Sequence, residues 1–419
     1  MEKFRKYLTI FSLGLAGGAI YILPYIKYVF YDQQMQVMGI TNAQSGMILS
    51  VYAITAVILF PLGGILADKI AIKKLMLFSL VATTVLTFLY AFTLDFKLSL
   101  VIWVCLAFTT GTTWWPSLIK AVGKTGSREE SGRTYGIYYA CNGICAALIN
   151  SIALWGSTLS DNPATGFFIA IALVGGGTVL AAIMIFLFYN ENNSMSENTE
   201  SDDEKFKLAD VGKVIKNPHT WLLGVVIFAS FTIYASASYF TPYLIDVVGI
   251  SPESSGVYAI IRTYIFMLLA PVGGYMCDKV LKTTANWFMM AFAMVALLYV
   301  GVLMIPSSAS VTFASIYTLI PGAIVMAEYG VAWSILRELD IPAVVVGTAI
   351  GLSSILGWLP DIFMHTMFGH WLDIYGNQGY TYIFMYLTVV ALLGFACGFI
   401  VQRNNRRKKL AGIEKATGL

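Results

Sequence analysis

Ionisable side chains inside long apolar stretches are the residues of this chain that could do chemistry. Lys27 and Arg262 are cationic, Glu328 and Asp361 are acidic, and His365 lies four residues after Asp361. If these stretches cross a bilayer, each ionised group costs about 2.5 to 3.5 kcal/mol at mid-membrane and requires a functional or structural reason. A planar guanidinium that is always charged suits a carboxylate, sulfonate or phosphate, so Arg262 is the main candidate for binding an anion.

Lys27 is a second cationic candidate for the same site. It follows Pro24 and lies close in sequence to three tyrosines that suit the wall of a cavity, namely Tyr21, Tyr25 and Tyr28. The alternative interpretation of Lys27 is a long side chain that reaches the outer membrane interface. The alternative for Arg262 is a structural ion pair.

The acidic residues and the histidine are candidates for coupling to protons. Proton coupling needs a group that gains and loses a proton near neutral pH, and a poorly hydrated carboxyl group or an imidazole can do this. Glu328, Asp361 and His365 fit that requirement. The competing interpretation is that Glu328 or Asp361 neutralises Arg262 or lines a vestibule. His365 lies towards the outer end of its helix, which favours a hydrated imidazole over a relay.

The composition predicts that apolar helices in a membrane position these groups. Hydrophobic residues make up 58% of the 419 residues and charged residues only 12%, with a mean hydropathy of +0.74. A soluble globule of this size needs more polar surface. The five cysteines lie in apolar segments without metal-ligand spacing, so we interpret them as packing residues.

Twelve stretches are long and apolar enough to span a bilayer, which takes about 20 residues each. They run from 7 to 30, 43 to 66, 75 to 93, 98 to 120, 134 to 156, 164 to 188, 220 to 245, 254 to 276, 287 to 305, 312 to 336, 343 to 368 and 380 to 401. With both termini in the cytoplasm, 23 of the 26 Lys and Arg residues fall in cytoplasmic ends or loops. The sequence therefore predicts a multi-pass plasma-membrane protein with cytoplasmic termini.

The polar segments predict four parts of the chain. Residues 1–189 and 219–402 form two six-helix bundles, and residues 190–218 form a cytoplasmic linker with a short amphipathic helix. Residues 403–419 form a basic cytoplasmic tail. The predicted fold is an all-α membrane protein of two pseudo-symmetric bundles.

An internal duplication supports this division. PLGGILADK at 61–69 returns as PVGGYMCDK at 271–279, 210 positions later. The same register pairs Arg262 with Tyr52, so the two halves place different chemistry at equivalent depth. Arg262 precedes Asp278 by 16 residues, about 24 Å along an unbroken helix, which places it well inside the membrane.

The duplicated motif resembles that of the major facilitator superfamily of secondary transporters, in which the loop after helix 2 reads GxLaDRxGRk. Gly64, Leu66, Ala67, Asp68, Lys69 and Lys73 match it, while Ala71 and Ile72 depart. The resemblance covers the whole chain and implies twelve helices around one central site. It also implies a cytoplasmic gate formed by both copies of the motif: Gly64, Asp68, Lys69, Lys73, Gly274, Asp278 and Lys279.

Helices 4 and 5 resemble the organophosphate:phosphate antiporter branch of that superfamily. The matching residues are Trp115, Pro116, Lys120, Glu130 and Gly132. The resemblance places the anion-binding side chains of that branch at Tyr25, Asn142 and Tyr234, where this chain lacks the basic residues. Trp115 beside Pro116 is a further candidate for the cavity wall.

The function predicted from these features is secondary active transport of a small organic anion by alternating access, coupled to protons or a counter-anion. The substrate-binding candidates are Arg262, Lys27, Tyr25, Tyr28, Tyr52, Trp115, Asn142 and Tyr234. The alternative is proton-coupled transport of a neutral solute, or drug efflux, with Arg262 in an ion pair. The chain has no HExxH, GxSxG or Walker-type motif, so we expect no enzyme, cofactor or metal. The basic residues form short cytoplasmic flanks of helices, so we expect no nucleic-acid partner. We also expect a monomer in the bilayer.

Overall fold

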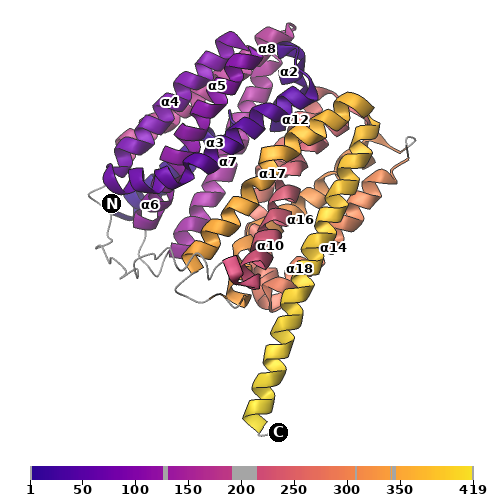
Figure 1. The fold of residues 1–419 in the computed structure, drawn as a ribbon. Coiled ribbons are helices and arrows are strands. Elements are labelled where there is room, and N and C mark those ends of the chain that lie inside the picture. Colours follow the sequence, from indigo (N-terminus) through magenta and orange to yellow (C-terminus); the bar gives the residue numbers. More distant parts are fainter. Residues whose placement is uncertain are drawn as a thin grey trace. The chain divides into compact units, whose positions relative to one another are not determined.

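Helices make up the regular structure of the part of the chain described by the computed structural model, which comprises residues 2–125, 131–190, 215–306, 309–339, 341 and 346–417. Figure 1 shows their order along the chain. Most of the predicted linker, including its amphipathic segment, lies outside these residues. Among the described residues, ten helical segments are long and apolar enough to cross a membrane. The other two predicted spans, 7–30 and 343–368, correspond to α1 with α2 and to α17.

The elements of the first half extend to residue 188. They are α1 (Glu2–Ile20), α2 (Lys27–Met38), α3 (Asn42–Lys69), α4 (Ile72–Thr93), α5 (Phe96–Leu106), the π-helix η1 (Ala107–Trp114), α6 (Trp115–Thr125), α7 (Ser131–Ser157) and α8 (Pro163–Phe188). The fourth predicted span is thus built from α5, η1 and α6. Pro116 lacks the N–H that would bond to Thr112, and the helix widens to a π-helix just before it.

The elements of the second half begin at residue 218. They are α10 (Pro218–Ser236), η4 (Ala237–Tyr239), α11 (Phe240–Asp246), α12 (Pro252–Thr263), η5 (Ile265–Leu269), α13 (Ala270–Tyr275), η6 (Met276–Val280), α14 (Thr284–Leu303), α15 (Val311–Tyr317), α16 (Leu319–Tyr329), η7 (Ala332–Glu338), α17 (Val346–Tyr375) and α18 (Gln378–Thr417). Short 3-10 and π segments interrupt several of the predicted spans in this half.

The duplication found in the sequence is visible in the local backbone. Gly39 and Gly249 have positive φ values of 61° and 79°, a conformation that suits glycine because it lacks a Cβ. Thr41 and Ser251 then cap the helices that follow, each accepting a hydrogen bond from the backbone N–H three residues later. Both copies therefore start a helix by the same means.

The first predicted span is not one helix, which corrects the prediction for 7–30. α1 ends at Ile20, and α2 starts at Lys27 after a segment of turns that contains Pro24. Proline removes a backbone donor and disfavours the helical conformation of the residue before it. The indole of Trp103 donates to the Pro24 carbonyl at 3.0 Å, which satisfies an acceptor that the break exposes.

The helix between Arg262 and Asp278 is also interrupted, so the predicted axial separation of about 24 Å does not apply. α12 ends at Thr263, and a 3-10 segment, a short α-helix and a π segment follow. Pro271 cannot donate a hydrogen bond to residue 267, so the regular helical pattern loses one hydrogen bond there. In contrast, α3 continues through the equivalent Pro61 without a break.

The chain divides into two compact units. Unit 1 comprises Met1–Thr199, Ser238–Leu268 and Asp361–Asn377, and unit 2 comprises Glu200–Ala237, Leu269–Pro360 and Gln378–Leu419. The chain passes between them at η4, beside η5 and after Pro360, which lies inside α17. These three crossings coincide with a 3-10 segment or a proline, whereas the crossing from Asn377 to Gln378 lies at the turn between α17 and α18.

Small residues allow close helix packing within each unit. In unit 1, a Cβ on Gly143 of α7 would lie 2.9 Å from the carbonyl oxygen of Tyr264. The missing side chain of Gly143 thus lets α7 approach the backbone at the end of α12 closely. In unit 2, a Cβ on Gly394 of α18 would lie 2.7 Å from the Phe292 ring of α14.

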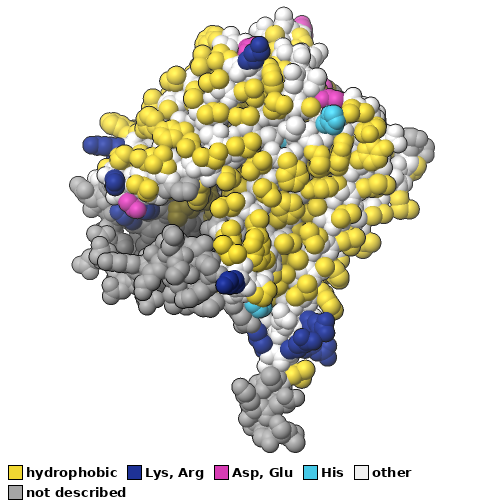
Figure 2. Space-filling view, in the orientation of Figure 1, with side chains coloured by type: hydrophobic (Ala, Val, Ile, Leu, Met, Phe, Trp, Pro, Cys, Tyr) yellow, Lys and Arg dark blue, Asp and Glu magenta, His cyan; other side chains and the backbone are white. Residues whose placement is uncertain are grey.

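Large apolar side chains on the outer helix faces are exposed, as expected for surfaces that contact lipid. Ile58, Val85 and Val389 are 69%, 61% and 65% exposed. Figure 2 shows apolar side chains over most of the visible helix faces and a group of Lys and Arg side chains at one end of α18. That group belongs to the predicted basic tail, and it lies just beyond the apolar part of the helix.

Candidate functional site

Lys27 is buried inside unit 1, at the first turn of α2. Its side chain is 2% exposed, and Nζ lies 5.1 Å from the ring centre of Tyr31 and 5.2 Å from that of Tyr239. Among the described residues, Nζ has no hydrogen-bond partner. The alternative in which Lys27 reaches an aqueous interface is therefore wrong for this conformation. Two aromatic faces stabilise its charge through cation–π contacts.

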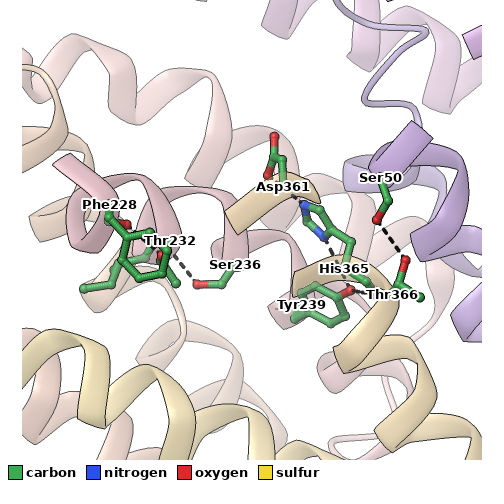
Figure 3. A network of polar contacts seen from close by, with 9 residues as sticks. Ser50, Phe228, Thr232, Ser236, Tyr239, Asp361, His365 and Thr366 are labelled. Carbon is green, nitrogen blue, oxygen red and sulfur yellow. Dashed lines mark hydrogen bonds and ion pairs between the residues drawn. The ribbon is translucent and has the colours of Figure 1, made fainter. Parts of the chain in front are cut away.

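Asp361 and His365 lie beside this lysine environment on α17. His365 Nε2 is 3.2 Å from an Asp361 carboxylate oxygen, and Nδ1 is 3.4 Å from the Tyr239 hydroxyl. Figure 3 shows the imidazole between these two side chains. The Tyr239 ring stacks on the imidazole with centres 5.7 Å apart. His365 is 0% exposed, so the predicted hydrated imidazole is wrong: Tyr239 and the helix packing exclude water from it.

We call Lys27, Tyr31, Tyr239, Asp361 and His365 the lysine–histidine cluster. Tyr239 joins its two parts, because one face of the ring is near the ammonium group and the ring also stacks on the imidazole. Its hydroxyl donates to the His365 backbone carbonyl at 3.0 Å, and this hydrogen bond fixes the Tyr239 side chain against α17. The cluster therefore brings an amine, an imidazole and a carboxyl group together away from bulk water.

Arg262 is fully buried in the same unit, at the end of α12. Nη2 donates to the Thr241 hydroxyl at 3.3 Å, and the guanidinium carbon lies 5.2 Å from the Phe240 ring centre. The Thr241 hydroxyl in turn donates to the Tyr28 carbonyl at 2.9 Å. Residues from α2, α11 and α12 thus hold the guanidinium next to the broken first span. Discontinuous helices of this kind often form substrate sites in transporters.

The predicted tyrosines of the first half form one aromatic group with these charges. Tyr25 lies 5.1 Å from Tyr28 and 5.7 Å from Tyr52 between ring centres, and Tyr28 lies 6.4 Å from His365. The Tyr52 hydroxyl shares a 2.7 Å hydrogen bond with the Thr110 hydroxyl, inside the π-helix η1. The structure therefore brings together three predicted tyrosines, from the segment of turns before α2, from α2 and from α3.

Two other predicted residues of unit 1 have separate contacts. Asn142 Nδ2 donates to the Tyr138 hydroxyl at 3.0 Å, one turn away on α7. Trp115 starts α6 and packs, half-buried, against the apolar core of the unit. No contact described here joins either residue to the lysine–histidine cluster.

The remaining predicted residues, Glu328 and Tyr234, lie in unit 2. The Ser230 hydroxyl donates to Glu328 at 2.6 Å, and the carboxyl group is 3% exposed. Tyr234 stacks on Tyr329 with centres 4.2 Å apart and an interplanar angle of 8°. Phe231 contacts both tyrosine rings and the Trp358 ring, at 5.2 to 6.1 Å. We call Ser230, Phe231, Tyr234, Glu328, Tyr329 and Trp358 the glutamate cluster.

The first copy of the duplicated motif forms polar contacts at the end of α3. The Asp68 carboxylate forms a hydrogen-bonded ion pair with Lys120, and both side chains are exposed to solvent. Lys73 donates to the Phe186 carbonyl at 2.8 Å. In the second copy, Asp278 and Lys279 lie in the π segment η6, directly after Gly274. Gly64 and Lys69 lie on the last turns of α3.

Several residues at these sites were not singled out from the sequence. They are Tyr31, Ser230, Tyr239, Phe240, Thr241, Tyr329 and Trp358. The run SASYFTPY at 236–243 was the available signal, because it places hydroxyl groups and Pro242 inside an apolar span. Within the described ranges, no group of three or more His, Cys, Asp and Glu side chains could hold a metal ion.

The long apolar helices, their breaks at prolines and the buried charges define a multi-pass membrane transporter. The sequence profile of the Major Facilitator Superfamily matches residues 7–360, and the chain belongs to this family. The family consists of transporters, so the protein is a membrane transporter and not an enzyme. The predicted superfamily is confirmed.

Two relatives from Escherichia coli match nearly the whole chain. The inner membrane protein YqcE is 28% identical over 402 residues, covering 95% of this chain and 94% of its own. The inner membrane protein YihN is 28% identical over 411 residues, covering 97% and 98%. The quinolone resistance protein NorA of Staphylococcus aureus is 23% identical over 312 residues, covering 73% of each chain.

Solved structures support the same fold. Two crystal structures of a bacterial homologue of the human lysosomal transporter Spinster, in inward-facing occupied and unoccupied conformations, align with TM-scores of 0.70 and 0.72. Each is 14% identical, and the alignments cover 96% to 97% of this chain and 96% to 98% of the other. At this identity the likeness establishes the twelve-helix fold alone.

Proposed function

We propose that the protein carries a small organic anion across the membrane by alternating access, coupled to protons or to a counter-anion. The observation that carries this proposal is the burial of two cationic side chains in unit 1. Lys27 and Arg262 are 2% and 0% exposed, and Asp361 is the one buried acidic residue among the described residues of that unit. Two positive groups and one negative group favour an additional negative charge from a ligand.

Arg262 binds the anionic group of the substrate in this proposal, and Lys27 supports it electrostatically. The tyrosines near them, Tyr25, Tyr28 and Tyr52, supply aromatic surface and hydroxyl groups. Glu328, Asp361 and His365 are the candidates for proton binding. Asn142, Trp115 and Tyr234 remain substrate-contact candidates. The organophosphate:phosphate antiporter branch is the proposed subfamily, on the residues of helices 4 and 5.

Ligand-induced stabilisation of the purified protein tests the substrate class. A ligand that binds the folded state raises the unfolding temperature, and the stabilisation increases with the logarithm of the ligand concentration relative to Kd. We expect small carboxylates, sulfonates or phosphate esters to raise it, and neutral sugars and cationic drugs to have no effect at equal concentration. Stabilisation by neutral or cationic compounds alone would contradict the anion assignment.

A second candidate function is proton-coupled transport of a neutral solute or drug efflux. The glutamate cluster supports it, because unit 2 contains a buried carboxyl group and four aromatic rings that contact one another. The similarity to the quinolone resistance protein NorA is consistent with it. Arg262 would then belong to a structural ion pair. The same ligand panel separates the two functions.

The arrangement in the membrane is part of the proposal. Residues 1–189 and 219–402 form the two bundles that move against each other, and both termini lie in the cytoplasm. The relatives YqcE and YihN are named as inner membrane proteins, which supports the cytoplasmic membrane as the location. We propose a monomer as the transporting unit, and the PxGGxxxDK copies as its cytoplasmic gate.

Asp68→Asn is expected to change the transport rate more than the affinity. The Asp68–Lys120 pair lies at the end of α3, away from the buried charges, so its loss should alter the movement of the helix and leave substrate contacts intact. Exposed pairs contribute about 1 kcal/mol or less, so we expect a rate decrease of about fivefold or less. Initial uptake rates and ligand-induced stabilisation measure the two effects. Normal rates with lost binding would contradict this role.

A further inference from the structure

The first turn of α3 is capped by a residue from the other end of the chain. An Asp373 carboxylate oxygen accepts hydrogen bonds from the Asn42 backbone and side chain, both at 2.9 Å. The other oxygen accepts from the Ala43 backbone N–H at 2.8 Å. The first N–H groups of a helix lack partners within the helix, and its N-terminus favours negative charge. Asp373, on α17, therefore joins two helices inside unit 1.

The same two helices touch backbone to backbone. A Cβ on Gly46 would lie 2.2 Å from the His365 carbonyl oxygen, and a Cβ on Gly369 would lie 2.3 Å from the Asn42 carbonyl oxygen. Further along, the Ser50 and Thr366 hydroxyls share a hydrogen bond of 2.8 Å, which Figure 3 shows. Positions 42, 46 and 50 recur every four residues, so they share one face of α3. We call this contact the α3–α17 seam.

The seam shares residues with the lysine–histidine cluster. The Tyr31 hydroxyl donates to Asn42 Oδ1 at 2.8 Å, and the Tyr31 ring is one of the two rings near Lys27. The His365 carbonyl packs against Gly46, while its side chain pairs with Asp361. A change of charge or ligand in the cluster therefore acts on residues that also form the seam.

We propose that the α3–α17 seam is the second gate of the transporter, closed by Asp373 at the end of α3 opposite to the PxGGxxxDK loop. α3 has 28 residues, so its two ends are about 40 Å apart, enough to reach both sides of a bilayer. The proposal rests on alternating access but not on the charge of the substrate. It adds a gating residue that the duplicated motif does not contain.

The second copy of the duplication shows why the seam forms at α3. The 210-residue register pairs Asn42 with Pro252 and Ala43 with Glu253. Pro252 lacks the N–H that Asn42 offers, and Glu253 places a carboxylate in the first turn of α12 itself. A carboxylate from another helix therefore finds more free N–H donors and less negative charge at the start of α3 than at the start of α12.

Asp373 is charged at neutral pH. Burial would raise its pKa, but the hydrogen bonds from Ala43 and Asn42 outweigh burial and hold the pKa below its ordinary value of 3.8. Hydrogen bonding to the charged form has this effect. The seam is therefore closed by a carboxylate.

Cysteine accessibility tests the seam without a substrate. In a full-length variant with the native cysteines replaced by serine, Ser50→Cys reports opening, because Ser50 is 6% exposed. We expect Asp373→Asn to increase the maleimide labelling rate of this cysteine about fivefold, because asparagine keeps one acceptor oxygen but loses the second one and the negative charge at the helix N-terminus. Asp95→Asn is the matched control: it neutralises an exposed capping carboxylate that accepts from the Leu98 N–H at 2.8 Å, at the start of its own helix α5. Equal rates in both variants would overturn the proposal.

A second pair of variants acts by volume and not by charge. Gly369→Ala places a methyl group against the Asn42 carbonyl and should also speed labelling, whereas Gly176→Ala has open space and should not. This pair decides the question if Asp373→Asn fails to fold, and unchanged labelling in Gly369→Ala would then overturn the gate. Because labelling needs no ligand, a failed anion assignment leaves the test intact. If the unchanged protein binds anions and neither Asp373→Asn nor Gly369→Ala changes the labelling rate, the gate proposal is wrong and the anion assignment stands.

Discussion

Arg262→Ala should abolish ligand-induced stabilisation by every anion that stabilises the unchanged protein. The guanidinium is fully buried and held by Thr241 beside the broken first span, where water cannot replace it. Removing one partner of a buried, hydrogen-bonded charge pair costs about 2 to 5 kcal/mol, so binding should weaken about 30-fold or more. Uptake into proteoliposomes should fall accordingly.

Graded variants separate charge from geometry at this position. Arg262→Lys keeps the charge but loses the planar fork, so it should recover part of the binding. Thr241→Val keeps the arginine and removes the hydroxyl that orients it, with a smaller loss expected. Arg403→Gln, exposed on α18, is the control for a lost arginine. Full uptake of all anions by Arg262→Ala would show that the arginine is structural and that another group binds the anion.

The charges of the candidate site could be predicted from the sequence, but not their neighbours. An ionised residue in an apolar span is rare enough to be noticed, which identified Lys27, Arg262 and Glu328. Tyr239 and Thr241 are residue types that occur throughout membrane helices as packing or interface side chains. Their importance arises from the tertiary contacts that place them against Lys27 and Arg262.

The fold shows the same limit. The duplicated register predicted that Gly39 and Gly249 occupy equivalent positions, and both have positive φ. It did not predict that the helix is continuous through Pro61 and interrupted before Pro271. Both prolines begin the same PxGGxxxDK motif, so the proline alone does not determine where the helix is interrupted. Asp373 was overlooked for a related reason, since an aspartate at a helix end is usually solvated.

Glu328→Gln should uncouple transport from protons while leaving the movement of the carrier intact. Glu328 is 3% exposed, and its described hydrogen bond comes from the Ser230 hydroxyl at 2.6 Å. Glutamine has the size of a protonated glutamate and keeps a carbonyl oxygen that can accept the hydrogen bond from Ser230. It cannot bind and release a proton near neutral pH. In proteoliposomes, accumulation driven by a pH gradient should disappear, whereas exchange of labelled for unlabelled substrate should continue, because exchange does not require proton release.

Two comparisons decide whether Glu328 itself carries the proton. Ser230→Ala removes the hydrogen bond but keeps the carboxyl group, so it should shift the pH profile of uptake and preserve accumulation. Glu338→Gln removes another carboxylate of unit 2, one that accepts from Asn405 at 2.8 Å near the start of α14, and should preserve coupling. If Glu328→Gln keeps proton-driven accumulation and Asp361→Asn loses it, the coupling site is the lysine–histidine cluster. The glutamate cluster would then serve substrate contact alone.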